Sequence, residues 1–132
     1  MIHLNKKYIW CERKIRMSEN KGKVYVIQEV AKFNVIPANE YGELVPLFEE
    51  GKQIMLSPAP AVRKAKEKLR NFNDDDFLLL IGDPSMIGLA CAVASDNNRG
   101  KYKVLKYDRR SFKYFPIQID LNERNTRDEQ EG

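Results

Sequence analysis

The sequence contains very few of the residues from which metal sites and nucleophilic sites are usually built. Its 132 residues include two cysteines, Cys11 and Cys91, and one histidine, His3. This is too little for a disulfide framework or a zinc site, so we expect no cofactor or metal. A Ser-His-Asp or Cys-His arrangement would have to use His3, so we favour a protein that is not an enzyme. Cys91 stands in an apolar stretch and is expected to be buried.

Long apolar runs and nucleotide-binding glycine motifs are also missing. No run could cross a bilayer, and residues 1–16 lack the apolar core of a secretory signal, so we expect a cytoplasmic protein without membrane contact. Neither G-x-G-x-x-G nor G-x-x-x-x-G-K-[ST] occurs. Hydrophobic residues make up 42% and charged residues 32% of the chain, which is typical of one globular domain.

The positive charge is confined to the start of the chain. The formal net charge is +4, and residues 1–16 hold five lysines and arginines against one glutamate, so the other residues are balanced. Met17 opens a polar run typical of an amino terminus and is an alternative start. We therefore expect a basic leader at 1–16 that need not be native, one domain at 17–121 and a polar tail at 122–132.

Alternating apolar and β-branched residues predict most of a β-sheet. Strands are expected at 23–30, 77–81, 101–107 and 112–119, with an extended segment at 33–37 and a polar loop at 38–43. Residues 44–48 and 53–56 flank Glu49-Glu-Gly-Lys52 and predict a hairpin. Pro46 indicates that 44–48 is an edge strand or irregular. Residues 77–81 are apolar on both faces, as in a strand covered by helices on each side.

Two proline-containing starts predict the helices. Ser57-Pro58 opens a helix at 58–72 and Asp83-Pro84 opens one at 84–95, with the first residue of each pair as N-cap. The second helix is apolar nearly all round and is expected to be buried centrally. The chain is therefore predicted to be a single α/β domain with a mixed sheet. It would have a βαβα core at 53–95, in which a crossover joins 53–56 to 77–81, and an antiparallel carboxyl-terminal hairpin.

The turn between strand and helix at 82–85 is one candidate ligand site. In α/β sheets, the amino terminus of a helix that follows a strand attracts anions. The candidate residues for a nucleotide or phosphate compound are Ser57, Gly82, Asp83 and Ser85. The alternative is purely structural, because Asp83 itself satisfies the helix N–H groups and repels phosphate.

The terminal hairpin and one helix face are candidate partner-binding surfaces. The hairpin interleaves cations with aromatic rings, a composition that suits contact with nucleic acid or with a protein. Alternatively, its rings face the core and its lysines protect an edge. The candidate residues are Lys103, Lys106, Tyr107, Arg109, Arg110 and Lys113 on the hairpin, and Arg63, Lys66 and Arg70 on the helix.

The carboxylates offer no selected catalytic or metal site. Asp74, Asp75 and Asp76 are consecutive, which does not match the spaced ligands of a calcium loop, so a helix-to-strand loop is the preferred interpretation. Elsewhere no spacing singles out an acid and a base from Glu29, Glu40, Glu43, Asp83 and Asp120.

About three quarters of the chain resembles a family of small tailed-bacteriophage proteins of unassigned function. The residues that carry the resemblance are Val24-Tyr-Val-Ile-Gln-Glu29, Tyr41-Gly-Glu-Leu44, the stretch from Asp74 to Pro84, the stretch from Leu105 to Arg109, and Pro116-Ile-Gln-Ile-Asp-Leu121. The resemblance implies a protein made inside a bacterial host and supplies no catalytic residues.

Three hypotheses about function follow. The first is a non-enzymatic phage accessory or host-interaction protein that binds a protein or nucleoprotein partner. The second is an enzyme or sensor that binds a nucleotide or phosphate compound at Gly82–Ser85. The third is direct binding of nucleic acid by the basic aromatic hairpin. A homo-oligomer remains an alternative.

Overall fold

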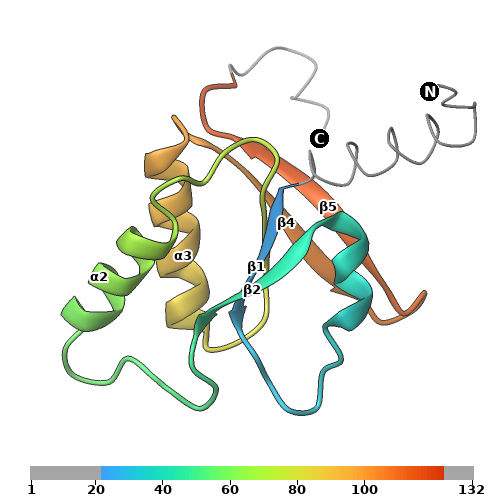
Figure 1. Cartoon of the computed structure of the whole chain (residues 1–132), viewed down its shortest axis with the longest axis horizontal. Helices are drawn as coiled ribbons and strands as arrows, with labels where there is room; N and C mark the ends of the chain where they lie inside the picture. Colours follow the sequence, from blue (N-terminus) through green and yellow to red (C-terminus); the bar gives the residue numbers. More distant parts are fainter. Residues whose placement is uncertain (1–21, 124–132) are drawn as a thin grey trace, which may run out of the picture.

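The computed structural model describes residues 22–123, which form a five-stranded sheet with three helices (Figure 1). In chain order the elements are β1 (Lys23–Gln28), the 3₁₀ helix η1 (Ile36–Tyr41), β2 (Glu43–Phe48), α2 (Ala59–Lys68), β3 (Phe77–Leu79), α3 (Pro84–Asn97), β4 (Lys101–Asp108) and β5 (Lys113–Asp120). The predicted α/β class, with a mixed sheet and two main helices, is confirmed. No helix within 22–123 is long and apolar enough to cross a membrane. The expected leader lies outside the described residues, as does all of the expected tail after residue 123.

The strands lie in the order β2-β1-β3-β4-β5. The first four run parallel, and β5 pairs antiparallel with β4, which confirms the predicted carboxyl-terminal hairpin. The chain passes from β1 to its neighbour β2 and then to β3 on the other side of β1, so the strand order reverses between β1 and β3. In doubly wound sheets this reversal marks the usual position of a ligand crevice.

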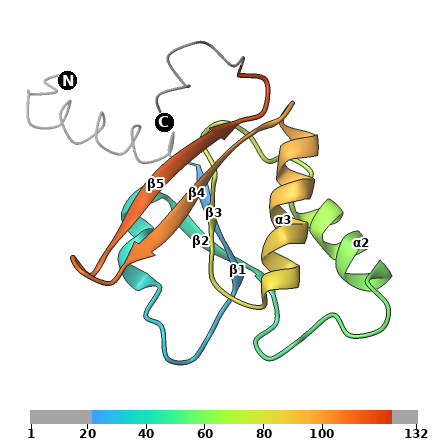
Figure 2. The same ribbon diagram turned by 180° about the vertical axis from the view of Figure 1, so that it is seen from behind.

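Helices cover both faces of the sheet, although unequally (Figures 1 and 2). α2 and α3 lie over one face, where Ile27, Leu69 and Leu78 are fully buried. η1 covers the other face, where Val24 and Leu105 are fully buried. All three residues of β3 are buried, as expected for a strand covered from both sides.

Both edges of the sheet are protected against further strand pairing. Pro46 stands in edge strand β2, and its carbonyl oxygen accepts a hydrogen bond from Lys68 Nζ at 3.0 Å, which confirms the predicted edge position. Pro116 stands in β5, where the Tyr41 hydroxyl donates to the Tyr114 carbonyl at 3.1 Å. Proline removes a backbone donor, so these edges are poor templates for another strand.

The predicted hairpin of 44–48 and 53–56 is wrong. β2 instead pairs in parallel with β1, and residues 53–56 are not a strand. The cause lies in the intervening turn, because the buried side chain of Gln28 binds the carbonyls of Glu49 and Lys52 and draws this segment out of the line of β2. The predicted core at 53–95 is corrected accordingly, because the connection to β3 starts from β2.

The segment from 33 to 43 and the start of α2 also differ from the prediction. Residues 36–41 form η1 with Pro37 in its first turn, instead of an extended segment followed by a loop. α2 begins at Ala59 and ends at Lys68, shorter than the predicted helix at 58–72. Pro58, not Ser57, occupies its N-cap position, and no side chain caps it.

α3 is less buried than its composition predicts. Asp83 caps it as expected, and its side chain accepts from the Ser85 N–H at 3.1 Å. Gly88 and Ala92, however, are exposed, because α3 lies on the outside of the sheet rather than between two layers. Cys91, predicted to be buried, is only partly so. Small side chains make this helix look apolar all round although one side faces solvent.

Candidate functional site

The turn between β4 and β5 is held in shape by Asp108. The side chain of Asp108 accepts hydrogen bonds from the Ser111 hydroxyl at 2.7 Å and from the Ser111 N–H at 3.0 Å. Its carbonyl accepts from the Phe112 N–H at 2.8 Å. The Ser111 hydroxyl first, and then the Ser111 N–H, lower the pKa of the Asp108 carboxyl, because these bonds favour its charged form. Residues 109–112 are thus organised before any partner binds.

Phe112 occupies an unusual backbone conformation at this turn. Its φ is +58°, in the left-handed region, where the Cβ of an L-residue crowds the following carbonyl. Its side chain is 75% exposed, so this cost is not offset by burial. Strained residues are concentrated at functional sites. The conformation therefore marks Phe112 as a candidate contact residue.

Arg109 and Arg110 belong to the same turn as Phe112. Both are exposed, and neither guanidinium makes a hydrogen bond or ion pair with another residue of 22–123. Arginine and aromatic residues are enriched among those that dominate binding energy at protein interfaces. We refer to Arg109, Arg110 and Phe112 as the hairpin tip.

The other predicted hairpin residues do not share one surface with the tip. Lys103 and Tyr107 lie on the η1 face: Lys103 Nζ is 4.2 Å from the centre of the Phe77 ring, and the Tyr107 ring is 5.2 Å from that of Tyr114. Lys106 and Lys113 are exposed on the opposite face, because side chains alternate along each strand. The basic and aromatic candidate residues of the hairpin are therefore divided between the two faces of the sheet, as the alternation of side chains along β4 predicts.

The predicted basic residues of α2 form a separate surface. Arg63 and Lys66 are exposed on α2, and Arg70 is exposed just after it. α2 and the β4–β5 turn lie at opposite sides of the molecule in both views (Figures 1 and 2). One small partner would not contact both surfaces.

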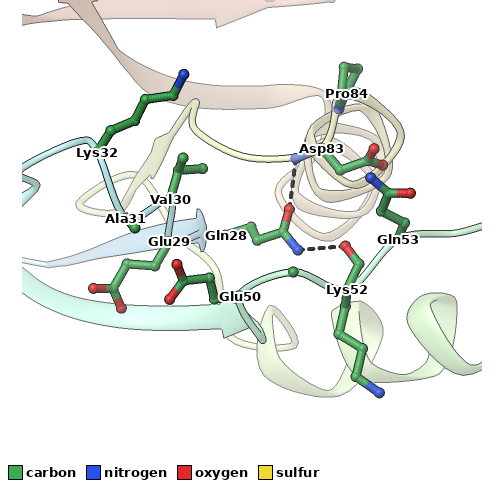
Figure 3. Close-up of a pocket in the computed structure, with 11 residues that line it drawn as sticks. Gln28, Glu29, Val30, Ala31, Lys32, Glu50, Lys52, Gln53, Asp83 and Pro84 are labelled. Carbon is green, nitrogen blue, oxygen red and sulfur yellow. Dashed lines mark hydrogen bonds between the residues drawn. The ribbon is translucent and has the colours of Figure 1, made fainter.

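A cavity of about 600 Å³ lies where β1, β2 and β3 end. Gln28 lines it and is only 4% exposed. Its Nε2 donates to the Glu49 carbonyl at 2.8 Å. Figure 3 shows its other two bonds: Nε2 donates to the Lys52 carbonyl at 2.6 Å, and Oε1 accepts from the Asp83 N–H at 2.7 Å. Gln28 therefore ties the loops after β2 and β3 to the end of β1, and it has no amide hydrogen left for a ligand.

The predicted phosphate-binding residues are only partly brought together. Asp83 lines this cavity, whereas Ser57 lines a second cavity of about 280 Å³ that is bounded by α2 and Met86. Gly82 lies against Gln28, and a Cβ at Gly82, where φ is +124°, would lie 3.0 Å from Gln28 Oε1. This close contact and the positive φ of Gly82 explain why position 82 is a glycine, with no role in ligand binding required.

The amino terminus of α3 offers little to an anion. The Ser85 N–H is bound by the Asp83 carboxylate, and the N–H groups of Met86 and Ile87 donate to the Asp83 carbonyl. The cavity beside it is lined by three carboxylates and two ammonium groups, those of Glu29, Glu50, Asp83, Lys32 and Lys52. This balance does not attract phosphate.

Two of the three consecutive aspartates, Asp74 and Asp76, have structural roles. Asp76 is buried and accepts from the N–H groups of Lys23 at 2.8 Å and Asn73 at 2.9 Å. Asp74 accepts from Asn98 Nδ2 at 2.9 Å, and this bond is the main cause that lowers its pKa. Within 22–123, no three His, Cys, Asp or Glu side chains are grouped to hold a metal.

Sequence reasoning missed Gln28 and the special conformation of Phe112 as features of the two sites. An amide at the end of an otherwise apolar strand was a usable indication that Gln28 bonds to neighbouring loops. Nothing in the sequence marked the left-handed conformation, because glycine, asparagine and aspartate are the residues that usually adopt it.

Comparison with known proteins identifies a family. The family model described as Phage Pam3 gp32-like protein matches residues 22–121, so the chain belongs to this family. This confirms the resemblance to a phage protein family. No curated protein and no solved structure matches the chain.

Proposed function

We propose that this member of the Phage Pam3 gp32-like protein family is a non-enzymatic phage accessory protein that binds a protein or nucleoprotein partner through its hairpin tip, in the cytoplasm of the bacterial host. The observation that supports this most is the exposed ring of Phe112, held at φ +58° beside two arginines whose guanidinium groups bind no other described residue. A shape that costs stability and buries nothing is best explained by a contact made outside the chain.

The hydrogen bonds of Asp108 reduce the conformational entropy that the turn would lose in this contact. A turn that is already ordered loses little conformational entropy when it binds. The guanidinium groups of Arg109 and Arg110 can each form two parallel hydrogen bonds to a carboxylate or phosphate, and the ring supplies apolar area. The tip therefore combines a directional polar contact with an apolar one.

The alternatives have less support. A nucleotide site at Gly82–Ser85 would need free helix N–H groups, which Asp83 already occupies. Direct nucleic-acid binding would use a continuous basic surface, whereas Lys103 and Lys106 lie on opposite faces of β4. Partner binding at the tip needs neither feature.

The proposal is tested by charge reversal at two places. A photo-reactive amino acid at position 112 first identifies the partner by crosslinking in bacteria that carry the gene. The affinity of the purified partner is then measured for Arg109→Glu/Arg110→Glu and for the matched control Arg63→Glu/Arg70→Glu. We expect a loss of about tenfold or more for the first variant, as for residues that dominate an interface, and little change for the second.

The opposite result would assign partner binding to the basic surface of α2. If Arg63→Glu/Arg70→Glu abolishes binding while the tip variant binds normally, the choice of surface is wrong. Equal unfolding midpoints of the two variants would show that neither result comes from misfolding.

A further inference from the structure

The loop between β2 and α2 exposes two large apolar side chains. Met55 is 77% exposed and Leu56 is 98% exposed, although Gln53–Leu56 is apolar enough to predict a strand. Neither side chain belongs to the two hydrophobic cores of the described residues. Places where a sequence departs from its own local pattern tend to be functional.

The base of this loop is fixed on both sides. On one side, the Lys52 carbonyl is bound by Gln28 and Ile54 packs against the core. On the other, the Pro58 carbonyl accepts from the Val62 N–H in the first turn of α2. Met55 and Leu56 therefore lie in a loop that is held in place on both sides.

The sheet places this loop on the same edge of the molecule as the hairpin tip. β1, β2, β3 and β4 run parallel, so the loops that follow them all leave the sheet at their carboxyl ends. Figures 1 and 2 show these loops along one edge, with the loop after β2 toward α2 and the β4–β5 turn at the other end. Met55 and Leu56 therefore lie near one end of this row of loops, and the hairpin tip with Phe112 lies at the other end.

The charge of this row of loops is mixed in sign. It carries four carboxylates and four cationic groups, from Glu29, Glu49, Glu50 and Asp83 and from Lys32, Lys52, Arg109 and Arg110. Nucleic-acid surfaces need an excess of cations. Protein interfaces combine apolar anchors with a polar rim of both signs, which is the composition found here.

We propose, on the basis of the proposed function, that Met55 and Leu56 are a second anchor of the interface formed by the hairpin tip, and that the partner is a folded protein. The surface of this partner has an apolar recess that receives Met55 and Leu56. It also has carboxylates that bind Arg109 and Arg110 at the other end of the row. A nucleic acid would meet Glu29, Glu50 and Asp83 between these two anchors.

Crosslinking at three positions of the full chain tests this inference. Photo-reactive residues are placed at 56, at 112 and at 121, in bacteria that carry the gene. Leu121 is the matched control, because it is 67% exposed but follows β5 at the opposite end of the strands, where β4 begins. We expect the same polypeptide to be captured at 56 and 112, not at 121, and equally after nuclease treatment.

Affinity for that purified polypeptide completes the test. Met55→Ser/Leu56→Ser should weaken binding about tenfold or more, whereas Leu121→Ser should leave it unchanged. Both variants change exposed side chains and should unfold at the wild-type midpoint.

Each other outcome overturns a defined claim. Capture at 112 alone, with normal binding by Met55→Ser/Leu56→Ser, overturns the second anchor and leaves the proposed function standing. Loss of capture on nuclease treatment overturns the protein partner. Capture of a second copy of this chain at 56 and 112 means that the surface serves self-association. No capture at 112 overturns the proposed function itself.

Discussion

Gln28 and Gly82 show how single residues set the geometry of the carboxyl-end edge. The amide of Gln28 holds the loops after β2 and β3 through three hydrogen bonds. Gly82 makes this possible because its backbone lies against the Gln28 side chain at a φ of +124°. An added methyl group would displace the amide and leave buried polar groups without partners.

Replacing glycine at two positions should have opposite effects on stability. Gly82→Ala should lower the free energy of unfolding by about 2 kcal/mol or more, through backbone strain and the clash with Gln28. Gly88→Ala, in exposed helix with nothing within 4 Å of the new Cβ, should raise it by about 0.5–1 kcal/mol. Denaturant unfolding of both variants checks this, and a neutral Gly82→Ala would show that the loops are not held as described.

For single residues, bonds between neighbours in the sequence could be predicted, whereas the exposure of an apolar side chain and a positive φ angle could not. Asp83-Pro84 predicted its helix cap correctly, because an N-cap bond involves neighbours two residues apart. The exposure of Leu56 depends on bonds that Gln28 makes to residues more than 20 positions away. The positive φ of Phe112 lies in the turn that joins β4 to β5, and no residue pattern in the sequence indicated it.

At the element scale, the β4–β5 turn should lose stability in acid. The lowered pKa of Asp108 means that its charged form is favoured in the folded turn. This stabilisation is complete above the carboxyl's usual range near pH 4 and is lost as the pH falls through the lowered pKa. Asp108→Asn should therefore be less stable than the wild type at pH 7, with the difference shrinking toward pH 3.

Unfolding at several pH values, with one partial variant, measures this effect. Ser111→Ala removes the hydroxyl but keeps the carboxylate, so it should lose only part of the pH-dependent difference. A difference between wild type and Asp108→Asn that is constant from pH 7 to pH 3 would contradict the role given to the charge of Asp108.

Strands and helices were predictable where their pattern is local, and their pairing was not. The β4–β5 hairpin and α3 were found because a turn signal and an N-cap define each one. The failure at 53–56 arose because a short apolar run reads as a strand whether or not a partner strand is available. Whether β2 pairs with β1 or with 53–56 depends on nonlocal contacts, chiefly those of Gln28 and Lys68.

For the whole molecule, the position of the charges is more informative than their sum. The net charge of +4 arises in residues 1–16, outside the described domain. Within the domain, basic residues are divided among α2, two faces of β4 and the hairpin tip. The fold class could be predicted from sequence, whereas the row of loops at one edge became visible only once four strands were known to be parallel.

If the hairpin tip binds a partner at the cost of backbone strain, relieving that strain should raise stability and weaken binding together. Phe112→Gly removes the left-handed strain and should raise the free energy of unfolding by about 1 kcal/mol. Arg99→Gly is the matched control, because Arg99 has a φ of +57° at the α3–β4 turn and should give a similar gain.

The deciding measurement is the affinity of both variants for the partner crosslinked at position 112. We expect Phe112→Gly to be more stable yet to bind about tenfold or more weakly, whereas Arg99→Gly should be more stable and bind normally. Wild-type affinity in Phe112→Gly, or an equal loss in both variants, would contradict this expectation.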